Sequence, residues 1–96
     1  MNLEWSVFAL ADRDDIFDFI EADSPRSAIR VDSAIEAQTE RLVDFPDSGR
    51  PGRIPGTREL IVTGLPYIVA YRVMGDTVHI LRVLHGSQQW PDGLPQ

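Results

Sequence analysis

The side chains that could do chemistry lie mostly in the second half of this 96-residue chain. They are arginines, two histidines and one glutamate: Arg50, Arg53, Arg58, Glu59, Arg72, His79, Arg82 and His85. Arginine presents a planar fork of donors that suits phosphate and carboxylate groups. Histidine can give or take a proton near neutral pH. Such a set could bind an anion and, with the right geometry, transfer a proton to it.

His85 is predicted at the end of a strand, where it could act as a general acid if an anion-binding arginine and a base lay nearby. Arg72 is predicted on the same sheet face, opposite His79 in the ladder. The alternative is that His85 only makes hydrogen bonds at the strand end. Glu59, next to Arg58, could be a base, or it could form ion pairs at the surface.

The segment 46–57 contains three prolines and three glycines and is predicted to be a loop. Its arginines, Arg50 and Arg53, could contact phosphate or protein, or could only keep an exposed loop in water. Residues 87–96 are predicted to form a tail. Trp90 is the only large apolar residue that could pin this tail onto the body of the domain.

Composition limits the classes of function. The chain has no cysteine, so neither a disulfide nor a thiolate nucleophile is available, and its two histidines lack the spacing of a metal site. We therefore expect no metal and no cofactor. No signal peptide and no apolar segment of membrane-spanning length is evident, which favours a cytoplasmic protein without a membrane partner.

Charge is unevenly distributed along the chain. Residues 1–48 carry twelve acids and four arginines, a net charge of −8, whereas residues 49–96 carry three acids and five arginines, a net charge of +2. An acidic chain is a poor candidate for binding nucleic acid, and no sequence-specific DNA binding is expected. The second half could still present a local basic patch.

The elements that position these residues can be predicted from periodicity and end signals. Residues 2–5 are expected to form an edge strand, followed by a helix from Ser6 to about residue 22 and a second helix from Pro25 to about residue 44. Three strands follow at 58–63, 67–74 and 77–84, and Gly75-Asp76 is the two-residue turn of a type II′ hairpin. The prediction is a single α+β domain, 1–96, with a two-helix hairpin on an antiparallel sheet of three to four strands.

An uninterrupted hairpin ladder assigns the apolar side chains to two faces. The bulkier face, which includes Tyr67, Tyr71 and Ile80, is predicted to meet the helices, together with a helical stripe that includes Phe19. The other face would remain uncovered. Because uncovered apolar faces usually mark interfaces, we expect a partner there. The residues concerned are Ile68, Ala70, Arg72, Leu81 and Val83.

Four segments of the chain resemble the RelE/ParE toxins of bacterial type II toxin–antitoxin modules. They are GRPGR at 49–53, GTREL at 56–60, PYIVAYRV at 66–73 and ILRVLHG at 80–86. The resemblance implies a helical hairpin on a small sheet. It also implies a cognate antitoxin that wraps the toxin, for which Ile68, Ala70, Arg72, Leu81 and Val83 would form the binding face, in a toxin–antitoxin hetero-oligomer.

The family contains two activities. One branch cuts mRNA on the ribosome, and the resemblance would then give catalytic roles to Arg58, Arg82 and His85. The ParE-like branch poisons DNA gyrase, and Arg50, Arg53 and Trp90 would then contact the target. Ile68 stands where the nuclease branch has a strand arginine, and residues 87–90 (SQQW) lack the arginine, lysine or tyrosine typical of nucleases. These departures favour the gyrase branch over the ribosomal endoribonuclease; a degenerate member that only binds its antitoxin is a third alternative.

Overall fold

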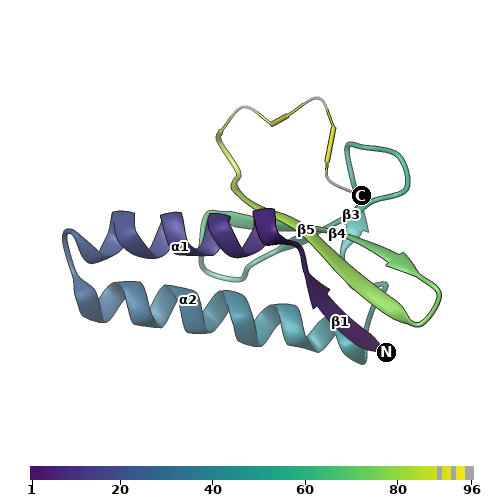
Figure 1. The fold of residues 1–96 in the computed structure, drawn as a ribbon, viewed down its shortest axis with the longest axis horizontal. Coiled ribbons are helices and arrows are strands. Elements are labelled where there is room, and N and C mark those ends of the chain that lie inside the picture. Colours follow the sequence, from purple (N-terminus) through teal and green to yellow (C-terminus); the bar gives the residue numbers. More distant parts are fainter. Residues whose placement is uncertain (89, 92, 95–96) are drawn as a thin grey trace.

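The protein is built from two helices packed on a five-stranded sheet (Figure 1). The computed structural model describes residues 1–88, 90–91 and 93–94. The strands are β1 (Asn2–Trp5), β2 (Arg50–Pro51), β3 (Arg58–Ile61), β4 (Tyr67–Met74) and β5 (Thr77–His85), in the spatial order β1-β5-β4-β3-β2. Only β1 and β5 pair in parallel. The predicted α+β class is confirmed, and the sheet contains one strand more than predicted, because the short β2 forms inside the predicted loop.

Both helices begin where their capping residues predict. α1 (Val7–Glu21) starts after Ser6, whose hydroxyl accepts a hydrogen bond from the Ala9 amide at 3.0 Å. α2 (Pro25–Glu40) starts after Ser24, with proline at its first position. α2 ends earlier than predicted and continues as a single 3₁₀ turn, η1 (Arg41–Val43). In the described part of the chain, neither helix is long and apolar enough to cross a membrane.

The helices bury one side against the sheet and bind each other through charge. Ile35 and Leu42 are fully buried and pack against β-strand side chains in the core. Arg13 of α1 forms a two-point ion pair with Asp32 of α2, at 3.0 and 2.9 Å. The assignment of Phe19 to the buried stripe is wrong, because its side chain is 80% exposed. Phe19 lies near the C-terminal end of α1 and lines an open cleft beside Tyr67 and His85, so it does not enter the core.

The β4–β5 hairpin has the predicted turn but not the predicted register throughout. Gly75 has a φ of +61°, which a type II′ turn requires at its first position, and Met74 pairs with Thr77. A bulge then leaves Leu81 without a direct partner: Ala70 pairs with Arg82, and the following pair on β4 is Tyr71 with Ile80. Because the faces of a strand alternate, this extra residue exchanges the faces of every residue after it.

The bulge overturns part of the predicted face assignment. Val83 pairs with Val69 and packs in the helix-facing core, so it does not share a face with Ile68. The prediction that the second face is uncovered is also wrong. Ile68 is 7% exposed, Leu81 2% and Ala70 is fully buried. The segment just after β5 contributes to this cover, because a Cβ atom at Gly86 would lie 3.5 Å from Ile68 Cδ1.

Side chains occupy some of the backbone hydrogen-bonding groups that lie past the short outer strands of the sheet. β1 pairs with β5 only as far as Ile80. Past that point Ser6 Oγ donates to the Leu81 carbonyl, and Asp12 accepts from the Val83 amide. On the other side, past β2, the Gln38 side chain accepts from the Thr63 amide and donates to its carbonyl. These contacts occupy backbone groups on β5 and after β3 that the short outer strands β1 and β2 do not reach.

Candidate functional site

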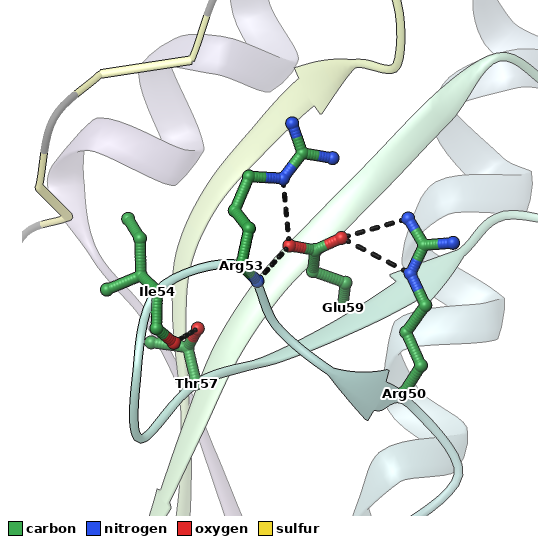
Figure 2. Close-up of polar contacts among 5 residues, drawn as sticks. All are labelled: Arg50, Arg53, Ile54, Thr57 and Glu59. Atoms are coloured by element: carbon green, nitrogen blue, oxygen red, sulfur yellow. Dashed lines mark hydrogen bonds and ion pairs between the residues drawn. The ribbon is translucent and has the colours of Figure 1, made fainter.

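The candidate target-binding surface centres on a carboxylate held between two arginines (Figure 2). Arg50 on β2 pairs in register with Glu59 on β3, so strand pairing brings their side chains together. Arg53 follows in the loop and reaches the same carboxylate from the other side. We call Arg50, Arg53 and Glu59 the arginine clamp.

Each oxygen of Glu59 is bound separately. Oε1 accepts from Nε and Nη2 of Arg50 at 3.3 and 3.0 Å, and Oε2 accepts from the backbone amide and Nε of Arg53 at 2.9 and 3.1 Å. The Glu59 side chain is only 3% exposed, whereas those of Arg50 and Arg53 are 50% and 43% exposed. The clamp therefore has a buried negative centre and an outward positive surface.

The pKa of Glu59 reflects two opposing effects. Burial of the carboxyl group alone would raise its pKa, but the hydrogen bonds from the Arg53 amide and the two guanidinium groups outweigh it and hold the pKa below the ordinary value of 4.5. Glu59 is thus ionised at neutral pH. A carboxylate with a lowered pKa, both of whose oxygens accept hydrogen bonds from arginine, is a poor general base, so the ion-pair alternative for Glu59 describes its observed role.

The loop that carries Arg53 is fixed by its own hydrogen bonds. The Thr57 hydroxyl donates to the Ile54 carbonyl at 2.6 Å (Figure 2), and the Gly52 amide donates to the Thr57 carbonyl at 2.8 Å. A side chain at Gly52 would collide with the Thr57 hydroxyl. The loop therefore holds Arg53 in a defined position.

Trp90 lies under the Arg53 guanidinium, with the guanidinium carbon 3.6 Å from the centroid of the indole ring. Such a cation–π contact leaves the rim of the guanidinium available for other acceptors. The prediction that Trp90 pins the tail is confirmed by this contact. Of the predicted tail, residues 89, 92, 95 and 96 lie outside the described residues.

Because the folded-state pKa of Glu59 is lowered, its stabilising contribution is present above pH 4.5 and is lost as the pH falls through the folded-state value. At about pH 7 we expect Glu59→Gln to lower the free energy of unfolding by about 1–3 kcal/mol. The difference between the two proteins should shrink in acid. Urea unfolding of both proteins from about pH 7 to pH 3 measures this.

Glu40→Gln is the matched control, since Glu40 is exposed. A gap between wild type and Glu59→Gln that stayed constant across this pH range would contradict the prediction.

Arg58 is bound to the segment before β2. Its Nη1 donates to the Gly49 carbonyl at 2.7 Å and to the Asp47 carbonyl at 3.3 Å, and Nη2 lies 3.6 Å from Asp47 Oδ1. These contacts hold the start of β2 against β3. They also engage Nη1 within the chain, and the Arg58 side chain is 36% exposed.

Arg82 is engaged by α1. Its Nε and Nη2 donate to the two Asp12 oxygens at 2.7 and 2.9 Å, and Asp12 Oδ2 also accepts from the Val83 amide at 2.8 Å. The hydrogen bonds that Arg82 donates to Asp12 raise the pKa of Arg82 above its ordinary value, although burial opposes this. Nothing in the sequence indicated that Asp12, 70 residues away, would be the partner of Arg82.

His85 makes local contacts at the end of β5. Its Nδ1 lies 2.7 Å from the Ser87 hydroxyl and accepts from the Ser87 amide at 3.1 Å, and its ring meets Tyr67 edge to face at 5.7 Å. His85 and Arg82 line one cleft of about 370 Å³, together with Asp15 and Phe19. This placement fits the alternative in which His85 makes hydrogen bonds at a strand end. His79, at the other end of β5, lies 3.4 Å from Glu4 and opposite Arg72.

The three residues considered for nuclease chemistry are not assembled in one place. Arg58 pairs with Tyr71 on β4, whereas His85 pairs with Tyr67, four residues along that strand. At about 3.3 Å per residue this separates their rows by roughly 13 Å, with β4 lying between them. Arg82 is near His85 but is bound to Asp12. Among residues 1–88, 90–91 and 93–94 there is also no group of three or more acidic or histidine side chains that could hold a metal.

Comparison with known proteins identifies the family. The model of a family described as the ParE toxin of type II toxin–antitoxin systems, parDE, matches residues 3–90. The chain is 46% identical over 93 residues to the candidate toxin Y4kP of Sinorhizobium fredii, covering 97% of this chain and 96% of that protein. It is 34% identical over 84 residues to the toxin RelE2 of Caulobacter vibrioides, covering 88% and 93%.

A solved structure shares the fold. The matching chain belongs to a chromosomal ParDE toxin–antitoxin system from P. aeruginosa, with a TM-score of 0.80 and 33% identity over 88% of this chain and 95% of that chain. The resemblance noted in the sequence is thereby confirmed: this chain belongs to the ParE toxin family, within the RelE/ParE toxins of type II toxin–antitoxin systems.

Proposed function

We propose that this protein is the toxin of a type II module, that it stops growth by poisoning DNA gyrase, and that a cognate antitoxin neutralises it. Support comes first from the family match over residues 3–90 and from the likeness to a chain of a ParDE system. A toxin of this kind acts by binding, and needs no catalytic residues of its own.

The observation that carries the choice of gyrase over mRNA is the state of the arginines. Arg58 and Arg82 donate to Asp47, Gly49 and Asp12, and their side chains are only 36% and 26% exposed. Ile68, at the strand position where a nuclease would have arginine, is buried. By contrast, Arg50 and Arg53 direct unused guanidinium nitrogens outward. This difference in exposure supports contact with a target through Arg50 and Arg53 over cleavage by Arg58 and Arg82.

The second candidate is ribosome-dependent mRNA cleavage. Two observations favour it: Arg82 and His85 line the same cleft, and a relative carries the name RelE2. For that activity Arg82 would have to release Asp12 and offer its donors to phosphate. The third alternative is a degenerate toxin that only binds its antitoxin. It requires no activity from the arginine clamp or from the cleft that Arg82 and His85 line.

Purified toxin should inhibit supercoiling by purified gyrase at micromolar concentration and should increase the amount of gyrase-linked, cleaved DNA. Arg53→Gln should weaken this inhibition by about tenfold, because Arg53 belongs to the proposed contact surface, whereas Arg30→Gln, an exposed arginine on α2, should not. Gel assays of plasmid topology and of linear DNA after denaturation measure both effects.

Induction in cells separates the three candidates. Gyrase poisoning predicts filamentation with DNA-damage signalling, mRNA cleavage predicts rapid loss of translation with cut transcripts, and a degenerate toxin predicts unaffected growth. Absence of supercoiling inhibition at micromolar toxin would rule out the gyrase proposal.

The face that the sequence predicted for antitoxin binding is not exposed in this structure. Ile68, Ala70 and Leu81 are buried, so an antitoxin could reach them only by displacing the chain segments that cover this face. Val83 packs in the core on the helix side of the sheet, so it does not lie on the same face as Ile68. Arg72 is half-buried at the margin of the same face.

A further inference from the structure

We infer that the arginine clamp binds the phosphodiester backbone of duplex DNA, so that the toxin contacts DNA as well as protein when it acts. The inference rests on the proposed function, because a poisoned gyrase holds a cleaved DNA segment beside the bound toxin. It concerns Arg50 and Arg53, which present a double fork of donors on one side of the molecule.

The clamp keeps guanidinium donors that Glu59 does not use. A guanidinium group carries five N–H donors. Arg50 gives Nε and Nη2 to Glu59, which leaves Nη1, and Arg53 gives only Nε, which leaves Nη1 and Nη2. No acceptor for these three nitrogens is found within the described part of the chain. Figure 2 shows them on the far sides of the two guanidinium groups, pointing away from the Glu59 carboxylate.

The two guanidinium groups of the clamp are already held in fixed orientations. An exposed arginine normally loses side-chain entropy when it binds a ligand. Here that entropy is already lost, because Glu59 fixes both guanidinium groups and Trp90 supports that of Arg53 from below at 3.6 Å. A buried glutamate that binds two half-exposed arginines therefore acts as a positioning residue. The outer edges of such forks match the oxygens of a phosphate.

The distribution of charge in the protein also favours an anion at the clamp. The clamp has two positive charges and one buried negative charge. The acidic excess of the protein lies in residues 1–48, which supply β1 and both helices. In Figure 1 the loop after β2 projects from the end of the sheet that lies away from the helical hairpin. The net charge of −6 makes free DNA binding weak, and the uneven distribution directs it to this one surface.

A phosphate ligand explains the choice of groups better than a protein carboxylate does. Glu59 already supplies the carboxylate that these arginines would seek in a protein. A DNA backbone offers acceptors to both outer forks at once, and it needs no base contact, in agreement with the expectation that the chain does not bind DNA sequence-specifically. Single-stranded RNA has the same phosphates, so the experiment includes it as a separate probe.

The test is a titration of the purified full chain with a short duplex DNA, followed by NMR of the arginine Nε–H groups and by fluorescence anisotropy. The Nε–H signals of Arg50 and Arg53 should shift on addition of duplex DNA, while that of Arg30 stays in place. The logarithm of the binding constant should fall with the logarithm of salt concentration with a slope near −1.8, as about two phosphate contacts require.

Three variants sharpen this test. Arg50→Gln and Arg53→Gln should each reduce the salt slope by about one, and Arg30→Gln, with the same change of charge on α2, should leave it unchanged. Glu59→Gln adds positive charge but frees the two forks. If Glu59 orients them, this variant should bind DNA no tighter than wild type; tighter binding would show that charge alone matters and would overturn the positioning role.

The DNA-binding inference is overturned if wild type binds no duplex at low salt, if Arg30→Gln weakens binding as much as Arg53→Gln, or if RNA of equal length binds more tightly than duplex DNA. These titrations contain no gyrase. Their failure is therefore distinguishable from failure of the supercoiling assay, which tests the proposed function alone.

Discussion

Asp12→Ala is expected to lower the free energy of unfolding by about 2–4 kcal/mol. Asp12 binds both the Arg82 guanidinium and the Val83 amide, and its side chain is only 13% exposed. Removing it leaves a half-enclosed positive charge and a strand amide without their acceptor. Urea unfolding monitored by circular dichroism measures the change.

Asp14→Ala is the matched control for this experiment, because Asp14 lies on the same helix and is exposed. It should change the free energy of unfolding by less than about 0.5 kcal/mol. A similar loss in both variants would mean that the general charge of α1, and not the contact between α1 and β5, sets the stability.

Gly49→Ala is expected to lower the free energy of unfolding by about 1–3 kcal/mol. A Cβ atom at Gly49 would lie 2.5 Å from the Tyr71 hydroxyl and 2.6 Å from its ring. Tyr71 cannot move aside, because it is fully buried and its hydroxyl donates to the Pro46 carbonyl while accepting from the Gly49 amide. Thermal unfolding would reveal a lower midpoint.

Gly93→Ala provides the comparison, since a Cβ atom there would meet nothing within 4 Å. Its unfolding midpoint should match that of wild type within the measurement. If Gly49→Ala were equally neutral, the segment 46–49 would be free to retreat from Tyr71, and the clamp arginines that follow it would be less firmly placed than the structure indicates.

Most of the fold could be predicted because its signals are local. The caps Ser6 and Ser24 fixed the starts of both helices, and the Gly75-Asp76 turn fixed the hairpin and the pairing next to it. The bulge at Leu81 could not be predicted, since it depends on how β5 meets β1 and α1 at once and has no signature in its own residues. That single extra residue changed the face of Val83.

The site was harder to predict for a related reason. Arg50, Arg53 and Trp90 were recognised as candidates from their types, but their organisation by Glu59 depends on the pairing of a two-residue strand. The bond between Arg82 and Asp12 spans 70 residues. The covering of Ile68 arises from segments with little pattern of their own. Contacts of this kind are decided by tertiary packing, which one sequence does not display.

The side-chain caps on backbone groups of β5 and Thr63 have a consequence for the fate of the isolated molecule. Gln38, Asp12 and Ser6 occupy backbone groups that an adjoining copy would otherwise use to extend the sheet. Fibril growth and runaway self-association need such groups as a template. A copy released from its inhibitor should therefore stay dispersed and able to diffuse, instead of being removed from action by its own precipitation.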